Sequence, residues 1–380
     1  MSESITFQLG PLPLRIEGDH LVVRWAQGTF AALQVDAPPR LVFRLTDDPL
    51  DDEPQMSVGD EHVRVAEDRM TWRERRFEIC ARGGDPMIFE LRQRDRRPLW
   101  LRSLTNPEET YKTWMSHGCG LDVHLLKEFA YTILPLAAQC ALLRGGGSLL
   151  HASALCVDDR GVMLPAWGGA GKSSVVSRAV LHGGACFLAD DHAIVDSTGV
   201  AHLHPMPMHI YHYHAAHDAL LRNRLCSSLS AAGRMQWWLA SAVRRKRVVR
   251  WTHPADLFGS EKLRRSAKIE QVIVMFRGRC DDFVWEEVDA AAAAQPCAAV
   301  IFEEINHLAD RLALGSAGWR PSVLPELNNA YEQTLAVYAA AFSKARCTRV
   351  LVPQGADGGV LVDYLSRQSS IIGEAMARSH

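Results

Sequence analysis

The stretch Gly168-Gly169-Ala170-Gly171-Lys172-Ser173-Ser174 decides how the rest of this chain is interpreted. The apolar run 161–164 precedes it, and a run compatible with a helix follows it. In a glycine-rich turn between a strand and a helix, backbone N–H groups and the positive end of the helix dipole converge on phosphate oxygens. Lys172 then reaches the β- and γ-phosphates, and the Ser173 hydroxyl can bind Mg²⁺. These seven residues are therefore predicted to bind ATP.

The loop departs from the pattern G-x-x-x-x-G-K-[ST] at its first position, where Ala166 stands and Trp167 follows. Alanine tolerates fewer backbone conformations than glycine, so we expect a tighter turn or a longer preceding strand than usual. The alternative is an ordinary glycine-rich turn, because short glycine patterns also occur by chance. The Gly-Lys-Ser sequence and its strand-then-helix context favour the phosphate-binding interpretation.

An acidic pair follows where a second element of a phosphate site is expected. After a predicted helix over 174–181, the run 185–189 is typical of a short buried strand, and it ends in Asp190-Asp191. Carboxylates at the end of a core strand can hold Mg²⁺ together with Ser173 and take a proton from an attacking hydroxyl. Asp-Asp also begins turns, and the runs 192–195 and 200–203 predict a hairpin directly after it. We favour a catalytic role for Asp190 and Asp191.

A histidine precedes the loop. His151 lies in the apolar run 149–155, which predicts a strand, and the turn 158–161 leads into the strand before the loop. A single histidine on an apolar strand is most often a core residue. Here a tight hairpin would make the two strands antiparallel neighbours and bring the imidazole near the transferred phosphate. His151 is therefore a candidate catalytic residue.

The order of these motifs resembles the HPr kinase/phosphorylase family and its relatives with the phosphoenolpyruvate-carboxykinase type of phosphate loop. The motifs are His151, then Gly171-Lys172-Ser173 after a hairpin, then Ala189-Asp190-Asp191. The likeness covers residues 151–191 and, as fold, extends to about residue 278. It implies that Lys172 and Ser173 serve the triphosphate and Mg²⁺. It also implies that Asp190 is the general base and that His151 assists near the transferring phosphate.

The sequence also departs from the family pattern. His-Ala-Ser replaces the family's His-Gly, Gly168 stands where the family has serine, and Ala166 replaces the leading glycine. The family's Leu-Glu-Ile-Arg-Gly type signature, which supplies a further acidic metal ligand, is missing, and Asp218 lies near the expected distance in a different context. These departures favour a divergent kinase on the same core over a true HPr enzyme.

Composition indicates a globular protein with a large core, since 47% of the 380 residues are hydrophobic and 23% are charged. The formal net charge of −2 gives no overall attraction to nucleic acid or an anionic membrane. We see no signal peptide at the N-terminus and no apolar run of the roughly 18 residues that a membrane span needs. Nine cysteines without a C-x-x-C pair predict reduced thiols. We expect a cytoplasmic protein with no membrane partner.

Two segments after the acidic pair have unusual compositions. Histidines concentrate between 202 and 217, with tyrosines at 211 and 213. Because no cysteine or carboxylate completes a familiar zinc spacing, we favour a strand and loop that line the acceptor side of the site. Basic residues concentrate between 222 and 279 and include Arg244-Arg245-Lys246-Arg247. We expect a solvated face with one or two arginines that bind phosphate or an acidic substrate, and no nucleic-acid partner.

The predicted fold class is α/β, a carboxykinase-like P-loop core with additions at both ends. Residues 1–104 predict a β-rich, antiparallel accessory domain for substrate docking, because short alternating runs (14–16, 21–25, 41–45, 62–65, 88–91) are separated by turn residues. Residues 105–147 predict a helical connector capped at Asn106. Residues 148–288 form the predicted kinase core, with a strand at 268–276, and 289–380 a mainly helical region.

Together these features predict an ATP- and Mg²⁺-dependent kinase that transfers the γ-phosphoryl group to a serine or threonine hydroxyl of a peptide or small protein. The peptide acceptor follows from the resemblance, since relatives of this core act on ribosomally made peptides. The alternatives are a kinase of a small metabolite and a non-catalytic module that binds ATP to switch a partner. A homo-oligomer is left open.

Overall fold

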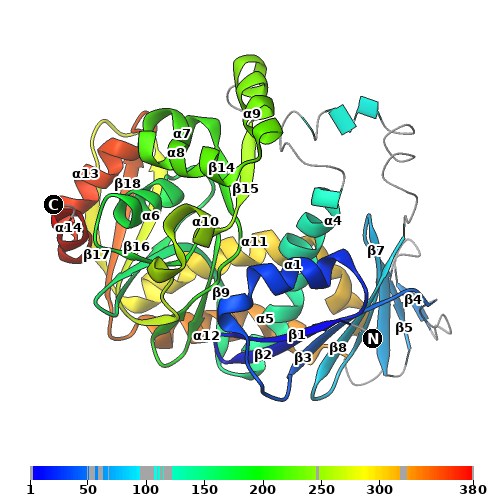
Figure 1. Ribbon diagram of the computed structural model, residues 1–380. Helices are drawn as coiled ribbons and strands as arrows, with labels where there is room; N and C mark the ends of the chain where they lie inside the picture. The colour runs from blue at the N-terminus through cyan, green and yellow to red at the C-terminus, as the bar shows by residue number, and fades with distance from the viewer. Residues whose placement is uncertain are drawn as a thin grey trace. The chain divides into compact units, whose positions relative to one another are not determined.

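The computed structural model describes residues 3–48, 50, 56–58, 63–66, 68–94, 107–108, 110–111, 114, 122–244, 248–316 and 323–378. They form a mixed α/β structure with several β-sheets (Figure 1). In these ranges no helix combines the length and the apolar character needed to cross a bilayer. The expected cap at Asn106 and the basic residues 245–247 lie outside the described residues.

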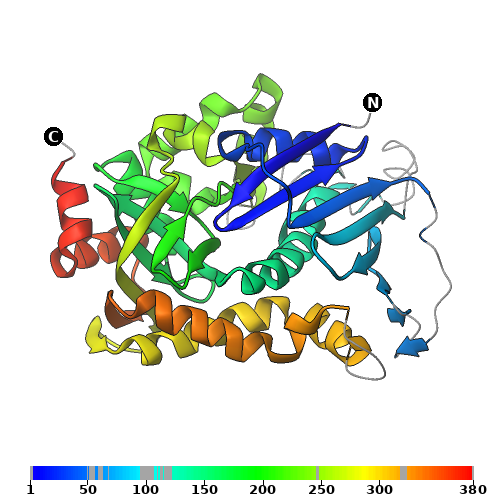
Figure 2. The same cartoon turned by 90° about the horizontal axis from the view of Figure 1, so that it is seen from below.

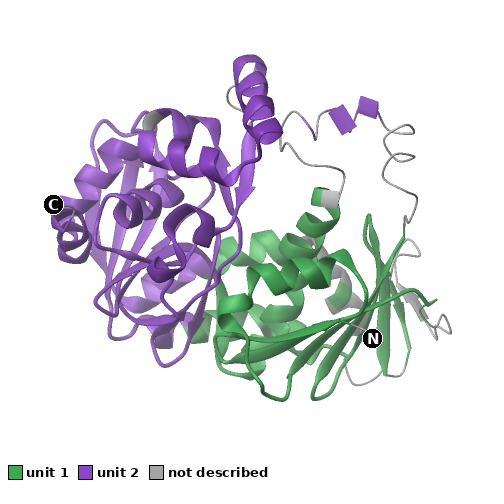
Figure 3. Cartoon of the chain, viewed as in Figure 1, with its two compact units in different colours: residues 1–98, 123–149, 298–337 green, residues 99–122, 150–297, 338–380 purple. Residues whose placement is uncertain are grey.

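Two compact units are built from interleaved parts of the chain (Figure 3). Unit 1 comprises residues 1–98, 123–149 and 298–337, and unit 2 comprises residues 99–122, 150–297 and 338–380. These units are defined by which residues pack together in space. The division of the chain into 1–104, 105–147, 148–288 and 289–380 remains a prediction from the sequence.

Unit 1 contains, in its described residues, a mixed sheet in the order β1-β2-β3-β8-β7-β6-β5-β4. Most neighbouring strands are antiparallel, but β2 and β3 are parallel, as are β3 and β8. The β-rich character of this region is confirmed, and the expectation of an antiparallel sheet is wrong for these two pairs. The strands are β1 (Ser4–Leu9), β2 (Leu12–Glu17), β3 (Leu41–Thr46), β4 (Met56–Val58), β5 (Val63–Val65), β6 (Arg69–Arg73), β7 (Phe77–Arg82) and β8 (Met87–Gln93).

The parallel pair β2–β3 follows from a helix that the sequence pattern misassigns. The run 21–25 predicts a strand because Val22 and Val23 favour strands, yet Leu21–Thr29 forms helix α1. His20 caps this helix by accepting a hydrogen bond from the N–H of Val22, and the side chains at 22, 23, 26 and 29 are buried on one face. A helix between two strands returns the chain to the same end of the sheet, so the strands run parallel.

Helices pack on the sheet of unit 1 and complete its core. Helix α4 (Asp122–Glu128) continues through a π-helical turn (Phe129–Ile133) into α5 (Leu134–Arg144), and both α1 and α5 contact the β1–β3 part of the sheet. The Phe43 and Phe129 rings meet edge to face at 5.2 Å. Helices α11 (Ala290–Ser316) and α12 (Ala330–Phe342) lie side by side, with the Phe302 and Tyr331 rings 5.3 Å apart (Figure 2). Short 3₁₀ turns are Ala31–Leu33 and Pro325–Asn329.

Unit 2 is built on a second mixed sheet in the order β10-β9-β12-β13-β16-β18-β17, with β11 also beside β9. Since β16 pairs with β10 as well, five of these strands close into a ring. The hairpin expected after the acidic pair is present as β12–β13. The strands are β9 (Gly147–Val157), β10 (Arg160–Pro165), β11 (Cys186–Ala189), β12 (His192–Asp196), β13 (Val200–His202), β16 (Ser266–Gly278), β17 (Val284–Val288) and β18 (Arg346–Pro353).

Helices and a two-stranded ribbon surround this sheet. The ribbon consists of β14 (Met208–Tyr211) and β15 (Val249–Thr252). Helix α13 contacts α6, so the end of the chain lies beside the helix that follows the glycine-rich loop. The helices are α6 (Lys172–Leu181), α7 (His212–His217), α8 (Ala219–Ser228), α9 (Ala231–Arg244), α10 (Pro254–Phe258), α13 (Gly358–Gln368) and α14 (Ser370–Ala377), with a 3₁₀ turn at Ser260–Lys262.

Candidate functional site

One edge of strand β9 positions the glycine-rich loop that is predicted to bind phosphate. Ala152 pairs with Pro165 across the antiparallel β9–β10 hairpin, so His151 lies where β10 ends and the loop begins. The Nζ atom of Lys172 lies 2.5 Å from Nε2 of His151 and donates to the carbonyl oxygen of Ala166 at 2.5 Å. An ammonium group can only donate hydrogen bonds, so His151 accepts through Nε2. His151 therefore holds the buried lysine of the loop.

Two glycines give the loop its shape. Gly169 has φ +82° and Gly171 has φ +101°, both in the region that favours glycine. A Cβ atom on Gly171 would also approach the Leu361 side chain to 2.7 Å. Ala166 instead extends β10 and forms a bridge with Met275, so no glycine is needed there. The longer preceding strand, one of the two expected consequences of this alanine, is what the structure has.

The opposite edge of β9 positions the acidic pair. Ala154 pairs with Ala189 of β11, so Ser153 lies beside Asp190, which follows Ala189 directly. The Ser153 hydroxyl donates to Oδ1 of Asp190, and the Ser173 hydroxyl donates to the same oxygen at 2.9 Å. Residues 151 and 153 are two apart in a strand, so their side chains point to the same face of the sheet. One face of β9 thus serves both the loop and the acid.

Asp190 and Asp191 also form the tight connection between β11 and β12, so the turn and the site use the same residues. Asp191 adopts φ +64°, a conformation that is strained for a residue with a side chain. Its Oδ2 atom lies 3.3 Å from Nδ1 of His209. Backbone strain of this kind is concentrated at functional sites.

The two carboxyl groups have pKa shifts of opposite direction. Burial raises the pKa of Asp190 to about 6, and the charge of Asp191 adds to this against the hydrogen bonds from Ser153 and Ser173. Burial also acts to raise the pKa of Asp191, but the hydrogen bond from His209 and the charge of that histidine hold the pKa below its usual range. Asp190 is thus the carboxyl group whose affinity for a proton suits proton transfer near neutral pH.

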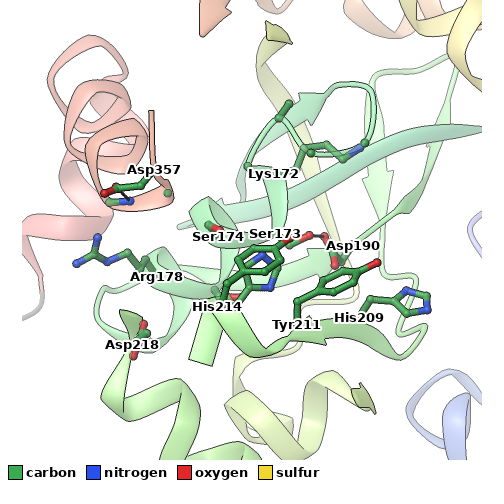
Figure 4. Close-up of a pocket in the computed structure, with 18 of the residues that line it drawn as sticks. Lys172, Ser173, Ser174, Arg178, Asp190, His209, Tyr211, His214, Asp218 and Asp357 are labelled. Carbon is green, nitrogen blue, oxygen red and sulfur yellow. Dashed lines mark hydrogen bonds between the residues drawn. The ribbon is translucent and has the colours of Figure 1, made fainter. Parts of the chain in front are cut away.

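A pocket of about 620 Å³ lies over the loop and the acidic pair (Figure 4). This volume is within the range of roughly 300–1,000 Å³ that is typical of small-molecule sites. The loop residues 168–174 and both aspartates line it. The structure therefore brings together the predicted loop, Lys172, Ser173 and the acidic pair around one cavity.

The histidine-rich segment contributes to the same pocket. His209, Tyr211, Tyr213 and His214 line it, and the Tyr211 and Tyr213 rings stack at 5.4 Å. Its role on the acceptor side stays a prediction. Other histidines of the segment have structural partners: Nε2 of His202 lies 2.7 Å from Asp196, and Nδ1 of His204 lies 2.7 Å from the His192 carbonyl oxygen.

The basic segment also contributes to the pocket, through Arg277. Its guanidinium donates to the carbonyl oxygens of Gln354 at 3.2 Å and Ala356 at 2.7 Å, which fixes the chain before α13. Asp218 lines the pocket as well, but it accepts from the Leu221 N–H at 3.0 Å and lies 2.8 Å from Nε2 of His182. Asp218 thus acts as the cap of α8.

The oxygen donors of the site fit Mg²⁺. The Ser173 hydroxyl and the carboxylates of Asp190 and Asp191 are hard ligands, which Mg²⁺ prefers, and Ser173 is hydrogen-bonded to Asp190 already. Mg²⁺ keeps several waters and is usually shared between one or two carboxylates and substrate phosphates. The residues predicted as metal ligands are therefore a suitable set.

Sequence reasoning missed several residues of the site, among them Ser153, which bonds to Asp190. Ser153 could have been found from its position two residues after His151 in a predicted strand, which places both side chains on one face. Two further missed features, Arg178 and the stretch Asp357-Gly358-Gly359, line the pocket itself. The acid-glycine-glycine sequence itself was the available signal for the stretch 357–359.

Comparisons with known proteins identify no family for this chain. No protein-family model matches the sequence, and no curated protein matches it. Among solved structures, the HPr(Ser) kinase/phosphatase from Coxiella burnetii aligns with 60% of this chain and 99% of its own, at 11% identity and a TM-score of 0.28. A TM-score this low supports no argument about fold or function. Any argument about function therefore has to come from the residues of the site.

Proposed function

We propose that this chain is an ATP-dependent kinase that transfers the γ-phosphoryl group to a serine or threonine hydroxyl of a peptide or small protein, in the cytoplasm. One observation carries the proposal. The hydroxyl of Ser173, at the start of α6 and beside the loop lysine, donates to Asp190 at 2.9 Å. A phosphate-binding loop and a proton acceptor therefore share one pocket, which is what phosphoryl transfer to a hydroxyl requires.

The proton chemistry falls to Asp190. With a pKa near 6, its carboxylate is mostly ionised at neutral pH and still accepts a proton readily. As the acceptor oxygen bonds to the γ-phosphorus and the bond to ADP breaks, the hydroxyl proton passes to Asp190. Two serine hydroxyls fix Oδ1 of this carboxylate, so its orientation is set before the acceptor arrives.

Phosphate binding falls to the loop. The first N–H groups of α6 have no partner within the helix and can donate to phosphate oxygens. Lys172 donates to Ala166 and contacts His151 in the present arrangement, and a triphosphate would compete for this ammonium group. When bound by Ser173 and the two aspartates, Mg²⁺ would neutralise charge on the β- and γ-phosphates.

The proposal is tested by following the γ-phosphoryl group of labelled ATP in the presence of Mg²⁺. ADP release is measured with water alone, with a pool of serine- and threonine-containing peptides, and with a pool of small hydroxylated metabolites. We expect transfer of label to the peptide pool. The matched control is Asp190→Asn, which should still bind ATP and transfer label about 100-fold more slowly or slower.

The outcomes separate the proposed function from its alternatives. Label in the metabolite pool alone would assign a small-molecule kinase. Tight ATP binding with no ADP release under any condition would assign a binding module. Failure to bind ATP or inorganic tripolyphosphate at all would reject the phosphate-binding loop and the proposal with it.

A further inference from the structure

The pocket continues past the phosphate loop along one face of α6. Ser174 and Arg178 are four residues apart, so they lie on the same face of the helix, about one turn or roughly 5.4 Å from each other. Both line the pocket, together with Ser177 between them. A ligand with phosphates at the start of α6 therefore has a cavity beside the second turn, where the groups attached to an α-phosphate would lie.

The start of α13 forms the opposite wall of this part of the pocket. A Cβ atom on Gly358 would lie 2.7 Å from Cβ of Ser174, and one on Gly359 would lie 2.7 Å from Nη1 of Arg178. Two glycines thus allow the backbone of this segment to approach α6 more closely than any other residues would. The close approach brings Asp357, which caps α13, beside the Arg178 guanidinium (Figure 4).

The two ends of the pocket differ in chemistry. Arg178, Asp218 and Asp357 lie at one end, and Asp190, Tyr211 and His209 lie at the other (Figure 4). Tyr211 and both aspartates line the pocket, and Figure 4 shows Tyr211 beside Asp190. The aromatic end is thus where the γ-phosphate and the acceptor meet, and the Arg178 end is left for the rest of the nucleotide.

We infer that Arg178 and Asp357 form the nucleoside subsite of this pocket, with the Asp357 carboxylate accepting hydrogen bonds from ribose hydroxyls and the Arg178 guanidinium lying against the base. The inference rests on the proposed function, because it assumes a triphosphate at the loop. Carboxylates are suitable acceptors for ribose hydroxyls, and the planar guanidinium stacks on aromatic rings. Leu221 adds apolar surface at the same end.

Asp357→Ser is the informative variant. Asp357 accepts from the N–H groups of Gly359 and Val360 through Oδ1, and serine also caps helices well, so α13 should keep its cap. The shorter serine side chain should not reach the ribose. The probes are ATP, 2′,3′-dideoxy-ATP and inorganic tripolyphosphate, whose dissociation constants are measured by calorimetry with Mg²⁺. The melting temperature verifies that the variant is folded.

We expect the wild-type chain to bind ATP about tenfold more tightly than 2′,3′-dideoxy-ATP, which corresponds to the loss of one hydrogen bond to a charged group. Asp357→Ser should bind the two nucleotides with the same affinity and should bind tripolyphosphate as the wild type does. Arg178→Met should weaken ATP and dideoxy-ATP by the same factor, again without affecting tripolyphosphate. This second variant keeps the inference testable if Asp357→Ser does not fold.

Three results would overturn the inference. The wild type could bind ATP and dideoxy-ATP equally, or Asp357→Ser could retain the discrimination between them. Alternatively, Tyr213→Ala could lose ATP affinity selectively while Arg178→Met does not, which would place the base on the aromatic end. In each case tripolyphosphate still binds, so the phosphate loop and the proposed function survive. Loss of tripolyphosphate binding by the wild type would instead reject the proposed function.

Discussion

Strand β9 has two edges, a cationic side next to β10 and an acidic side next to β11, and they hold their charged groups in different ways. On one side the cation of Lys172 contacts His151 and the carbonyl oxygen of Ala166. On the other side Asp190 accepts from two serine hydroxyls. In the proposed kinase, a triphosphate would take Lys172 from its present partners, whereas Asp190 would keep Ser153 throughout the reaction. Under the proposed function, the cationic side would therefore rearrange when the ligand binds, and the acidic side would be arranged in advance.

The cationic side should show the largest effect of a single substitution. Lys172→Ala removes the charge that would reach the β- and γ-phosphates, and we expect turnover to fall below detection and the dissociation constant of ATP to rise by about tenfold or more. Calorimetry and an ADP-release assay measure the two effects. The matched control is Lys344→Ala, an exposed lysine far along the sequence, which should change neither.

A Lys172→Ala variant that binds ATP as tightly as the wild type and remains active would contradict the phosphate-loop interpretation. It would also remove the contrast between the two sides, because the cation would then serve only the packing of β9 against the loop.

The acidic side should show the next largest effect, on kcat rather than on binding. Asp190→Asn keeps the shape of the side chain and removes the proton acceptor, so we expect kcat to fall by about 10²-fold or more while ATP affinity stays within a few-fold. In the wild type, kcat/KM should fall as the pH drops below about 6, because the raised pKa of Asp190 means that the carboxyl group becomes protonated there. The variant should lack this acid limb.

Asp191→Asn is the matched comparison for this prediction. The pKa of Asp191 is held low, so its ionisation cannot explain an acid limb near pH 6. If Asp191→Asn were the less active variant and also abolished the limb, the assignment of the base would have to be reversed.

The loop and the acidic pair could be predicted from the sequence because their chemistry needs particular residues next to one another. Gly171-Lys172-Ser173 and Asp190-Asp191 are short local patterns. Ser153 could not be assigned to Asp190 in this way, because their contact depends on how β11 pairs with β9. Asp357 lies still farther along the chain, and only the packing of α13 on α6 brings it to the pocket.

The misassigned run 21–25 shows the converse limit of local patterns. Valines favour strands on average, but here the cap at His20 and the burial of one helical face outweigh that preference. Propensity is a weak guide where tertiary packing decides, and the parallel strand pair beside α1 followed from the same choice.

The contact between His151 and Lys172 on the cationic side can be tested by substitution. We expect His151→Ala to lower kcat by roughly 10- to 100-fold, because Lys172 loses a partner that positions it. His151→Gln should restore much of the activity, since the side-chain oxygen of glutamine can accept from the ammonium group. Steady-state kinetics and the melting temperature are measured for both variants. A stable His151→Ala variant with normal kcat would show that the histidine serves the core alone.

The smallest effect is expected at Ser153. It shows whether the Ser153 hydroxyl orients the Asp190 carboxylate or is only a buried group. Ser153→Ala removes one of the two hydroxyls on Oδ1 of Asp190 and leaves Ser173, so kcat should fall by only about three- to tenfold. In the wild type the hydrogen bond from Ser153 stabilises the ionised carboxylate. Without it the pKa of Asp190 should rise, and the acid limb of kcat/KM should move to higher pH. Ser148→Ala is the matched control, because it removes another fully buried hydroxyl from the same strand, one bonded to Gln139 instead. Both variants should lose stability, but only Ser153→Ala should move the acid limb. If the two variants had the same kinetics, Ser153 would be a packing residue and the acidic side of β9 would depend on Ser173 alone.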